Sequence, residues 1–96
     1  MTDATRGAER CVLFVGHTGR REALEAVVGA AKRLSAAGVG VRVLADEAPD
    51  MALPGAHTVP SGPRAAQGCE LVMVFGGDGT LLRAAELARE TATPVL

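Results

Sequence analysis

An aspartate surrounded by glycines is the feature of this sequence that most clearly points to chemistry. Asp78 lies within the segment Gly76-Gly77-Asp78-Gly79-Thr80. Glycines let another molecule approach the backbone closely, and a helix that begins at such a loop presents free N–H groups to an anion. A loop that only holds phosphate gains nothing from a carboxylate, because like charges repel. We therefore expect Asp78 to take a proton from an attacking hydroxyl group or to act beside a metal ion.

The residues around this loop predict a strand, a tight turn and a helix. The unbroken apolar run at residues 71–75 is typical of a strand buried on both faces of a parallel sheet. Thr80 stands where a helix N-cap is expected. Apolar residues then recur at helical spacing, namely Leu81, Leu82, Ala85 and Ala88. The structural alternative is an Asp-Gly turn in a hairpin, but it needs a second alternating strand after Thr80.

Two common nucleotide-binding motifs do not fit this loop. It lacks the third glycine of the dinucleotide-binding pattern G-x-G-x-x-G, and no Gly-Lys-Ser or Gly-Lys-Thr follows it as in a P-loop. The aspartate itself must therefore indicate the chemistry.

A second loop, at residues 16–21, also has residues suited to an anion. It follows a predicted strand at residues 11–15 and precedes a predicted helix, so in a parallel sheet it lies at the same edge as residues 76–80. Thr18, Gly19 and Arg20 could line the same crevice, where an arginine can bind phosphate in bidentate fashion. The alternative is an ordinary turn with Thr18 as helix cap and solvated arginines. We interpret His17 as a loop residue rather than a catalyst.

The order of these segments predicts an α/β fold with a parallel sheet. The helix from Glu22 to the C-cap Gly38 carries one apolar face, formed by Leu24, Val27, Val28, Ala31 and Leu34. Residues 39–43 alternate valines with other residues, which indicates a second strand near the sheet's edge. Strand, helix and strand at this spacing predict a βαβ unit. Asp46 and Glu47 follow the second strand, where a ribose-binding acid sits in dinucleotide-binding folds.

The remaining segments have weaker patterns. Residues 46–63 contain four of the five prolines and no periodicity, which predicts a surface loop. Residues 64–68 could form one helical turn. Residues 93–96 resemble the opening of a further strand, so we expect residues 11–96 to be an α/β domain that is incomplete at its C-terminus. The polar residues 1–10 predict a flexible N-terminus.

Composition restricts the function further. Ninety-six residues form at most one small domain, and a formal net charge of −1 offers no electrostatic case for nucleic-acid or membrane binding. The two aromatic residues, Phe14 and Phe75, provide no stacking platform for bases. The opening residues are polar and contain no apolar segment typical of a signal peptide, and no run approaches membrane-spanning length, so we expect a cytoplasmic protein. Cys11 and Cys69 lack metal-binding spacing, which favours buried free thiols over a structural pair or a redox site.

In this context the loop at residues 76–80 resembles the GGDGT loop of the NAD kinases. Diacylglycerol and sphingosine kinases share that loop, and 6-phosphofructokinases carry a looser version. The flanking residues 81–88 and 93–96 look like those of bacterial NAD kinases, and residues 15–20 are similar to the actinobacterial branch. Lipid kinases usually place an Asn-Glu pair soon after the loop, and none follows here. The resemblance implies a Rossmann-like, phosphofructokinase-like N-terminal domain without the family's β-rich second domain.

The resemblance also implies a reaction, in which the γ-phosphoryl group of ATP passes to the 2′-hydroxyl of the adenosine ribose of NAD. Asp78 matches the proton acceptor, and Arg83 matches a residue that contacts NAD. Gly76, Gly77, Gly79 and Thr80 match the loop that approaches substrate and phosphates. A divalent cation, Mg²⁺, should offset phosphate charge. The rival hypotheses are a lipid kinase of the same superfamily and a non-catalytic nucleotide-binding module.

The family's active cleft forms between two domains and, in many members, across subunits. The resemblance therefore implies that the full-length protein is a homo-oligomer and that residues 1–96 alone are inactive.

Overall fold

A single parallel sheet forms the centre of the molecule. The computed structural model describes residues 10–16, 21–51, 53 and 55–96. Four strands pair in the order β4-β3-β2-β5, and every pairing is parallel. Their bounds are β2 (Cys11–Gly16), β3 (Gly40–Leu44), β4 (His57–Val59) and β5 (Leu71–Phe75). The predicted α/β fold with a parallel sheet is confirmed.

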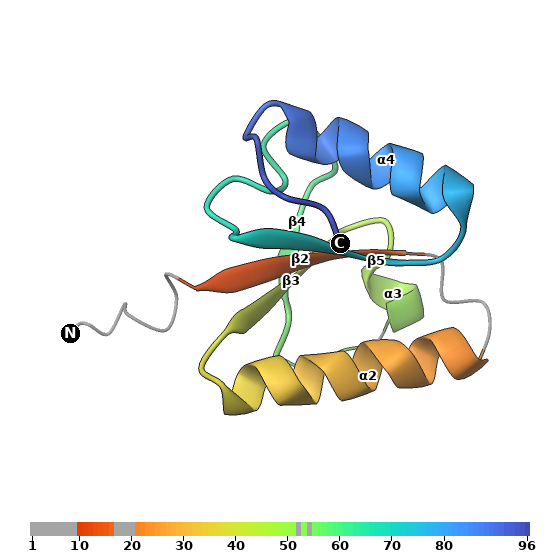
Figure 1. Ribbon diagram of the computed structural model, residues 1–96. Coiled ribbons are helices and arrows are strands. Elements are labelled where there is room, and N and C mark those ends of the chain that lie inside the picture. Colours follow the sequence, from red (N-terminus) through yellow and green to blue (C-terminus); the bar gives the residue numbers. More distant parts are fainter. Residues whose placement is uncertain (1–9, 17–20, 52, 54) are drawn as a thin grey trace.

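Helices cover both faces of this sheet (Figure 1). Helix α4 (Asp78–Arg89) lies over one face, and helices α2 (Arg21–Ala36) and α3 (Ala48–Met51) lie over the other. Successive side chains of a strand point to opposite faces, so β2 supplies both cores. Leu13 and Val15 pack in the core under α4, while Val12 and Phe14 pack in the core with α2.

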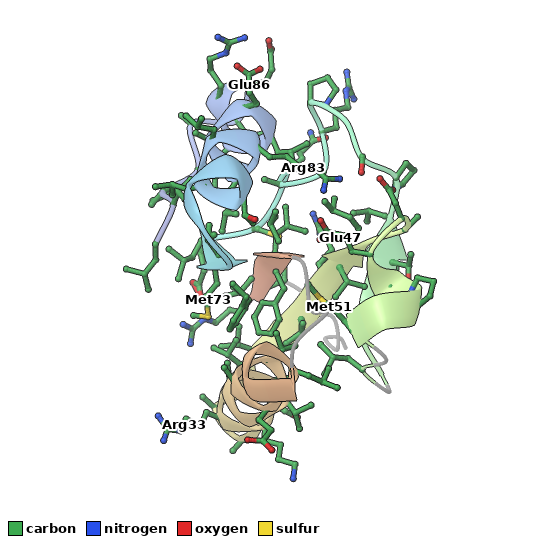
Figure 2. The ribbon with its side chains drawn as sticks, turned by 90° about the vertical axis from the view of Figure 1, so that its right-hand side faces the viewer. Arg33, Glu47, Met51, Met73, Arg83 and Glu86 are labelled. Carbon is green, nitrogen blue, oxygen red and sulfur yellow. The ribbon has the colours of Figure 1, made fainter. Side chains whose placement is uncertain are left out.

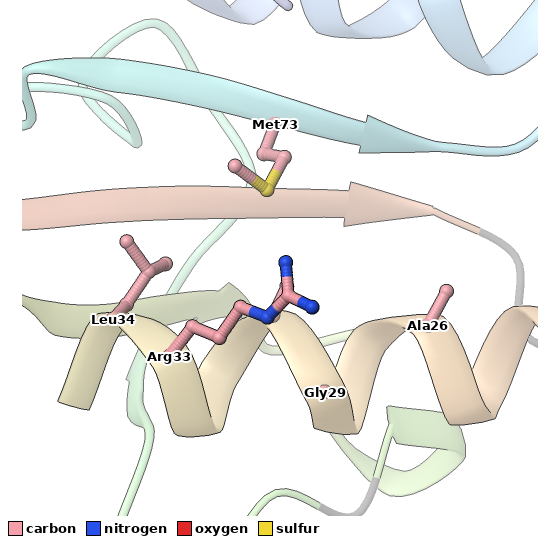
Figure 3. A pocket seen from close by; sticks show the side chains of 6 residues that line it. Ala26, Gly29, Arg33, Leu34 and Met73 are labelled. Carbon is pink, nitrogen blue, oxygen red and sulfur yellow. The ribbon is translucent and has the colours of Figure 1, made fainter. Parts of the chain in front are cut away.

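Strand β2 is more deeply buried than β5. All six residues of β2 are buried, whereas in β5 only Val72 is. The prediction that residues 71–75 form a strand is confirmed, but the prediction of burial on both faces is wrong. The reason is that α2 does not cover β5 completely, because a cavity of about 470 Å³ lies between them, beside Met73 and Leu34 (Figure 3). The described residues lining this cavity include none of the predicted site residues.

The proline-rich stretch contains two short elements that the sequence did not predict. Residues 46–63 include α3 and β4, so the prediction of a loop is wrong over these residues. Strand β4 pairs with β3, opposing Val43 to Thr58, so β3 is an interior strand directly beside the edge strand β4. A four-residue helix and a three-residue strand are too short to show apolar periodicity in the sequence. Strand β4 is stabilised by its pairing with β3, which the local sequence does not reveal.

The last residues of the chain pair with β5 through an isolated bridge. Val95 forms a parallel bridge to Val72, whose N–H donates to the carbonyl oxygen of Pro94 at 2.8 Å. The N–H of Leu96 donates in turn to the carbonyl oxygen of Val72 at 2.8 Å. Residues 64–68, by contrast, form successive turns rather than a helical turn.

Helix α4 buries only some of its apolar residues against the sheet. Its buried residues are Ala84, Leu87 and Ala88, which lie one turn apart. Leu81 and Leu82 share the helical spacing but are 48% and 70% exposed. The phase of the helix is set by where the preceding loop leaves β5, which the apolar spacing alone did not determine.

Residues 1–9 lie outside the described residues, so the prediction of a flexible N-terminus remains a prediction there. The guanidinium of Arg10 pairs with the carboxylate of Glu70, with 3.0 Å between Nη2 and Oε2.

Among the helices that the structure describes, none is long and apolar enough to cross a membrane.

We predict that Gly16→Ala destabilises the fold by about 1–3 kcal/mol, because an added methyl group overpacks this position. A Cβ atom at Gly16 would lie 2.9 Å from Cβ of Phe75 and against its carbonyl oxygen. Gly29→Ala is the matched control, since nothing lies within 4 Å of a Cβ there. That change should stabilise the α2 helix by roughly 0.5–1 kcal/mol. Urea unfolding measures both, and equal stability of the two variants would contradict the steric argument.

Candidate functional site

The two glycine loops start side by side at the carboxyl edge of the sheet. Gly16 at the end of β2 is opposite Phe75 at the end of β5 in the parallel register. The loops that follow these two strands therefore leave the sheet at neighbouring points, as predicted from the parallel arrangement. Within the first loop, His17, Thr18, Gly19 and Arg20 lie outside the described residues, so their part in the site stays a prediction.

The second loop requires glycine at its first position. Gly76 has φ of +155°, and a Cβ atom there would lie 2.7 Å from Oγ1 of Thr80. The hydroxyl group of Thr80 thus occupies the space that a side chain at Gly76 would need. The loop is shaped by this contact between its two ends.

Helix α4 begins directly in the loop, earlier than predicted. Gly77 is the N-cap in extended conformation, and the N–H of Leu81 donates to its carbonyl oxygen at 3.1 Å. The prediction of Thr80 as N-cap is therefore wrong, because Thr80 already lies in the first helical turn. In the part of the chain that the structure describes, no side chain caps this helix. Its first N–H groups and its dipole can therefore bind an anion.

Asp78 occupies the first position of α4. Its side chain lies outside what the structure describes, so its predicted role as proton acceptor stays a prediction. The backbone position is informative all the same. A residue at the first helical position lies next to the amide groups that would hold a phosphate, as the proposed chemistry requires.

A buried acid next to this loop was not recognised as a structural residue from the sequence. Glu47, directly after β3, has a side chain that is only 9% exposed. Its Oε1 accepts a hydrogen bond from the N–H of Gly16 at 3.1 Å, and its Oε2 accepts one from Nη1 of Arg83 at 2.6 Å. Figure 2 shows Arg83 reaching from α4 toward Glu47. The one carboxylate thus links the ends of β2 and β3 to α4.

The outer side of Arg83 has further partners. Its Nη2 lies 3.3 Å from Oδ2 of Asp46, and the hydroxyl group of Ser61 donates to the same carboxylate at 3.1 Å. The Arg83 side chain is 41% exposed. The sequence suggested Asp46 and Glu47 as ribose-binding acids, whereas the structure pairs both with Arg83. The usable signal was their position directly after a strand at the carboxyl edge, together with an arginine early in the helix that follows the glycine loop.

These contacts explain why a buried carboxylate is tolerated here. Removing an ionised group from water costs several kcal/mol unless hydrogen bonds and an opposite charge replace the lost hydration. Both oxygens of Glu47 have such partners. As to metals, the described residues contain no group of three His, Cys, Asp or Glu side chains placed to hold an ion.

The site's loop and fold agree with a known family. The family model described as "ATP-NAD kinase N-terminal domain" matches residues 12–96. The chain belongs to the NAD kinase family. This membership confirms the resemblance that the GGDGT loop and its flanks indicated.

Individual NAD kinases from actinobacteria show the same similarity. The chain is 46% identical over 109 residues to an NAD kinase of Rhodococcus erythropolis, covering 100% of this chain and 35% of that protein. It is 50% identical over 101 residues to one of Mycolicibacterium paratuberculosis, covering 93% of this chain and 33% of that protein. NAD kinase 2 of Streptomyces coelicolor is 46% identical over 94 residues, with coverage of 96% and 31%. The chain thus spans about a third of the length of the curated relatives it matches.

We predict that Glu47→Gln lowers the free energy of unfolding by about 1–3 kcal/mol, because an amide cannot replace the buried charge that Arg83 needs. Glu86→Gln is the control, since Glu86 pairs with Arg89 at 3.7 Å and both side chains are at least 70% exposed. The control should change stability by less than about 0.5 kcal/mol. Urea unfolding compares the two, and an equal loss would show that the buried carboxylate does not hold α4 in place.

Proposed function

We propose that this chain forms the phosphate-binding half of an NAD kinase site. In the complete protein, the γ-phosphoryl group of ATP passes to the 2′-hydroxyl of the adenosine ribose of NAD, giving NADP. The observation that carries this proposal is the glycine loop between β5 and α4, in a chain that belongs to the NAD kinase family. Its position at the carboxyl edge of a parallel sheet is where α/β folds bind their ligands.

Each residue of the glycine loop has its own role in the proposed site. Gly76, Gly77 and Gly79 let phosphates approach the backbone, and the first N–H groups of α4 donate to them. Asp78 accepts the proton of the attacking 2′-hydroxyl, which makes that oxygen a better nucleophile. Thr80 keeps the loop in shape through its contact with the Gly76 position.

Arg83 and the first loop complete the cationic side of the site. Arg83 is held by Glu47 and Asp46 yet 41% exposed, so its guanidinium can also reach a pyrophosphate of NAD. Thr18, Gly19 and Arg20 follow β2, whose last residue is adjacent to the end of β5. We propose that they contact phosphates from the opposite side of the crevice.

We propose that a magnesium ion binds here mainly through the substrate phosphates rather than through a set of protein side chains. The described residues offer no cluster of three ligating side chains, and Asp46 and Glu47 are engaged with Arg83. Mg²⁺ usually keeps several waters and binds through substrate phosphates with one or two carboxylates. When bound, the ion would offset negative charge on the transferring phosphoryl group.

The decisive experiment uses the longest natural chain that contains these residues. The purified protein is incubated with Mg²⁺ and γ-labelled ATP against NAD, diacylglycerol and sphingosine. We expect label in NADP, and we expect Asp78→Asn to lower turnover by roughly 10²–10⁴-fold while nucleotide binding persists. Glu90→Gln is the matched control, because Glu90 is exposed at the far end of the same helix and should leave turnover unchanged.

The other outcomes distinguish the rival hypotheses. Label in a lipid would assign the protein to the related lipid kinases. A well-folded protein that labels no acceptor but binds nucleotide would be a binding module. We expect residues 1–96 alone to transfer no label, because the family's cleft needs its second domain, and turnover by this fragment would overturn that expectation.

We propose further that the complete protein is a cytoplasmic homo-oligomer. Leu81 and Leu82 support an association, since they leave apolar surface exposed on α4 directly beside the loop. Light scattering after size exclusion should give a mass of at least two chains, and Leu82→Glu should lower that mass. A monomer at micromolar concentration would contradict this proposal.

A further inference from the structure

Two cysteines that are 58 residues apart in the sequence meet at the amino edge of the sheet. Cys11 is the first residue of β2, and Cys69 lies just before β5. Their Sγ atoms are 2.8 Å apart. The backbones are joined beside them, because the N–H of Glu70 donates to the carbonyl oxygen of Cys11 at 3.0 Å. This edge is opposite to the one that carries the glycine loops.

The surroundings give a small oxidant access to this pair. Cys11 is 7% exposed, but it lines a cavity of about 230 Å³ together with Arg10, Arg42 and His57. A site of this size admits a molecule a little larger than water. Cys69 is half-buried against the core under α4. Both cysteines are free thiols in this structure.

We propose that Cys11 and Cys69 form a modification site, in which hydrogen peroxide converts the two thiols to a disulfide. Cys11 loses its proton, and its thiolate attacks one peroxide oxygen while the O–O bond breaks. The leaving hydroxide takes up that proton and becomes water, and Cys11 becomes a sulfenic acid. The sulfur of Cys69 then attacks the sulfur of this sulfenic acid, displacing its oxygen as a second water. In sum, two thiols lose two hydrogens and two electrons, and one peroxide is reduced to two waters.

The order of these steps follows from the raised pKa of Cys69 and from the position of Cys11 at the cavity. Burial, and next the hydrogen bond to Cys11, raise the pKa of Cys69 to about 12, although the nearby charge of Arg42 opposes the shift. Cys69 therefore keeps its proton at neutral pH and is a poor first nucleophile. Cys11 is a lining residue of the cavity, so we assign the first reaction with peroxide to Cys11.

The cross-link would close a long loop with little change to the fold. A disulfide needs an S–S distance of about 2.05 Å, so the two sulfur atoms need to approach by less than 1 Å from 2.8 Å. Parallel neighbouring strands already place the two backbones side by side. Because the bond constrains mainly the unfolded chain, the enclosed loop should give a marked gain in stability. The inference is independent of the kinase proposal, since it involves no residue of the glycine loops.

Peptide mapping tests the proposal without any variant. The longest natural chain is treated with hydrogen peroxide while folded, its remaining thiols are blocked, and trypsin digestion is done without reductant. Cleavage after Arg10, Arg20, Arg64 and Arg83 leaves Cys11 in peptide 11–20 and Cys69 in peptide 65–83. We expect these two peptides joined, at two hydrogens below their summed mass, and separated by dithiothreitol. The oxidised protein should melt roughly 10 °C or more above the reduced one.

Two serine variants test the order of events. Cys69→Ser should accumulate the sulfenic acid on Cys11, which dimedone traps, whereas Cys11→Ser should leave Cys69 reduced. Dimedone labelling of Cys69 in Cys11→Ser at the rate seen for Cys11 would overturn the assigned order. Peptides 11–20 and 65–83 that remain separate and reduced in the folded wild-type chain, but become joined once urea unfolds it, would overturn the site itself.

Discussion

Strand β2 is hydrogen-bonded on both sides in parallel register, and the rest of the structure depends on this pairing. It opposes Cys11–Phe14 to β3 and Val12–Gly16 to β5. Because all three strands run in one direction, their carboxyl ends meet at one edge, and the loops that follow them converge there. The close fit of Gly16 against Phe75 sets how near the two glycine loops can start. The site is therefore a consequence of strand direction before it is one of side-chain chemistry.

The carboxylate of Glu47 fixes the position of helix α4 relative to the strand ends at this edge. A strand pairing alone does not determine how a helix lies above the sheet. Glu47 joins the N–H at the end of β2 to a guanidinium on α4, and it is held in place by following β3 directly. A charge buried to this extent is stable only when its partners are present, so the helix cannot shift without leaving the carboxylate unpaired. The start of α4, with its uncapped first N–H groups, is thereby positioned relative to β2 and β3.

The two edges of the sheet carry different chemistry for the same topological reason. The carboxyl edge gathers helix starts and glycine loops, whose backbone N–H groups favour anions. The amino edge gathers the segments that enter the strands, and there Cys11 and Cys69 meet in a half-buried environment. Residues that are distant in the sequence become neighbours at whichever edge their strand begins or ends. The thiol pair is as much a product of parallel pairing as the glycine loop.

The sequence by itself determined the parallel α/β fold, the strand at 11–15, the helix ended by Gly38 and the glycine loop around Asp78. These features have local causes, namely apolar periodicity, glycine conformations and the free amides of a helix start. Their kinship with NAD kinases could also be read from the loop and its flanks. The helix cap at Thr80 and the loop over the residues of α3 and β4 were predicted wrongly. Helix α4 is capped by Gly77, so Thr80 lies inside its first turn, and β4 forms because its residues pair with the distant strand β3. Which apolar residues of α4 are buried depends on the phase of this helix over the core. Glu47 with Arg83, and Cys11 with Cys69, were decided by tertiary structure alone, because only the folded sheet brings their strands to a common edge.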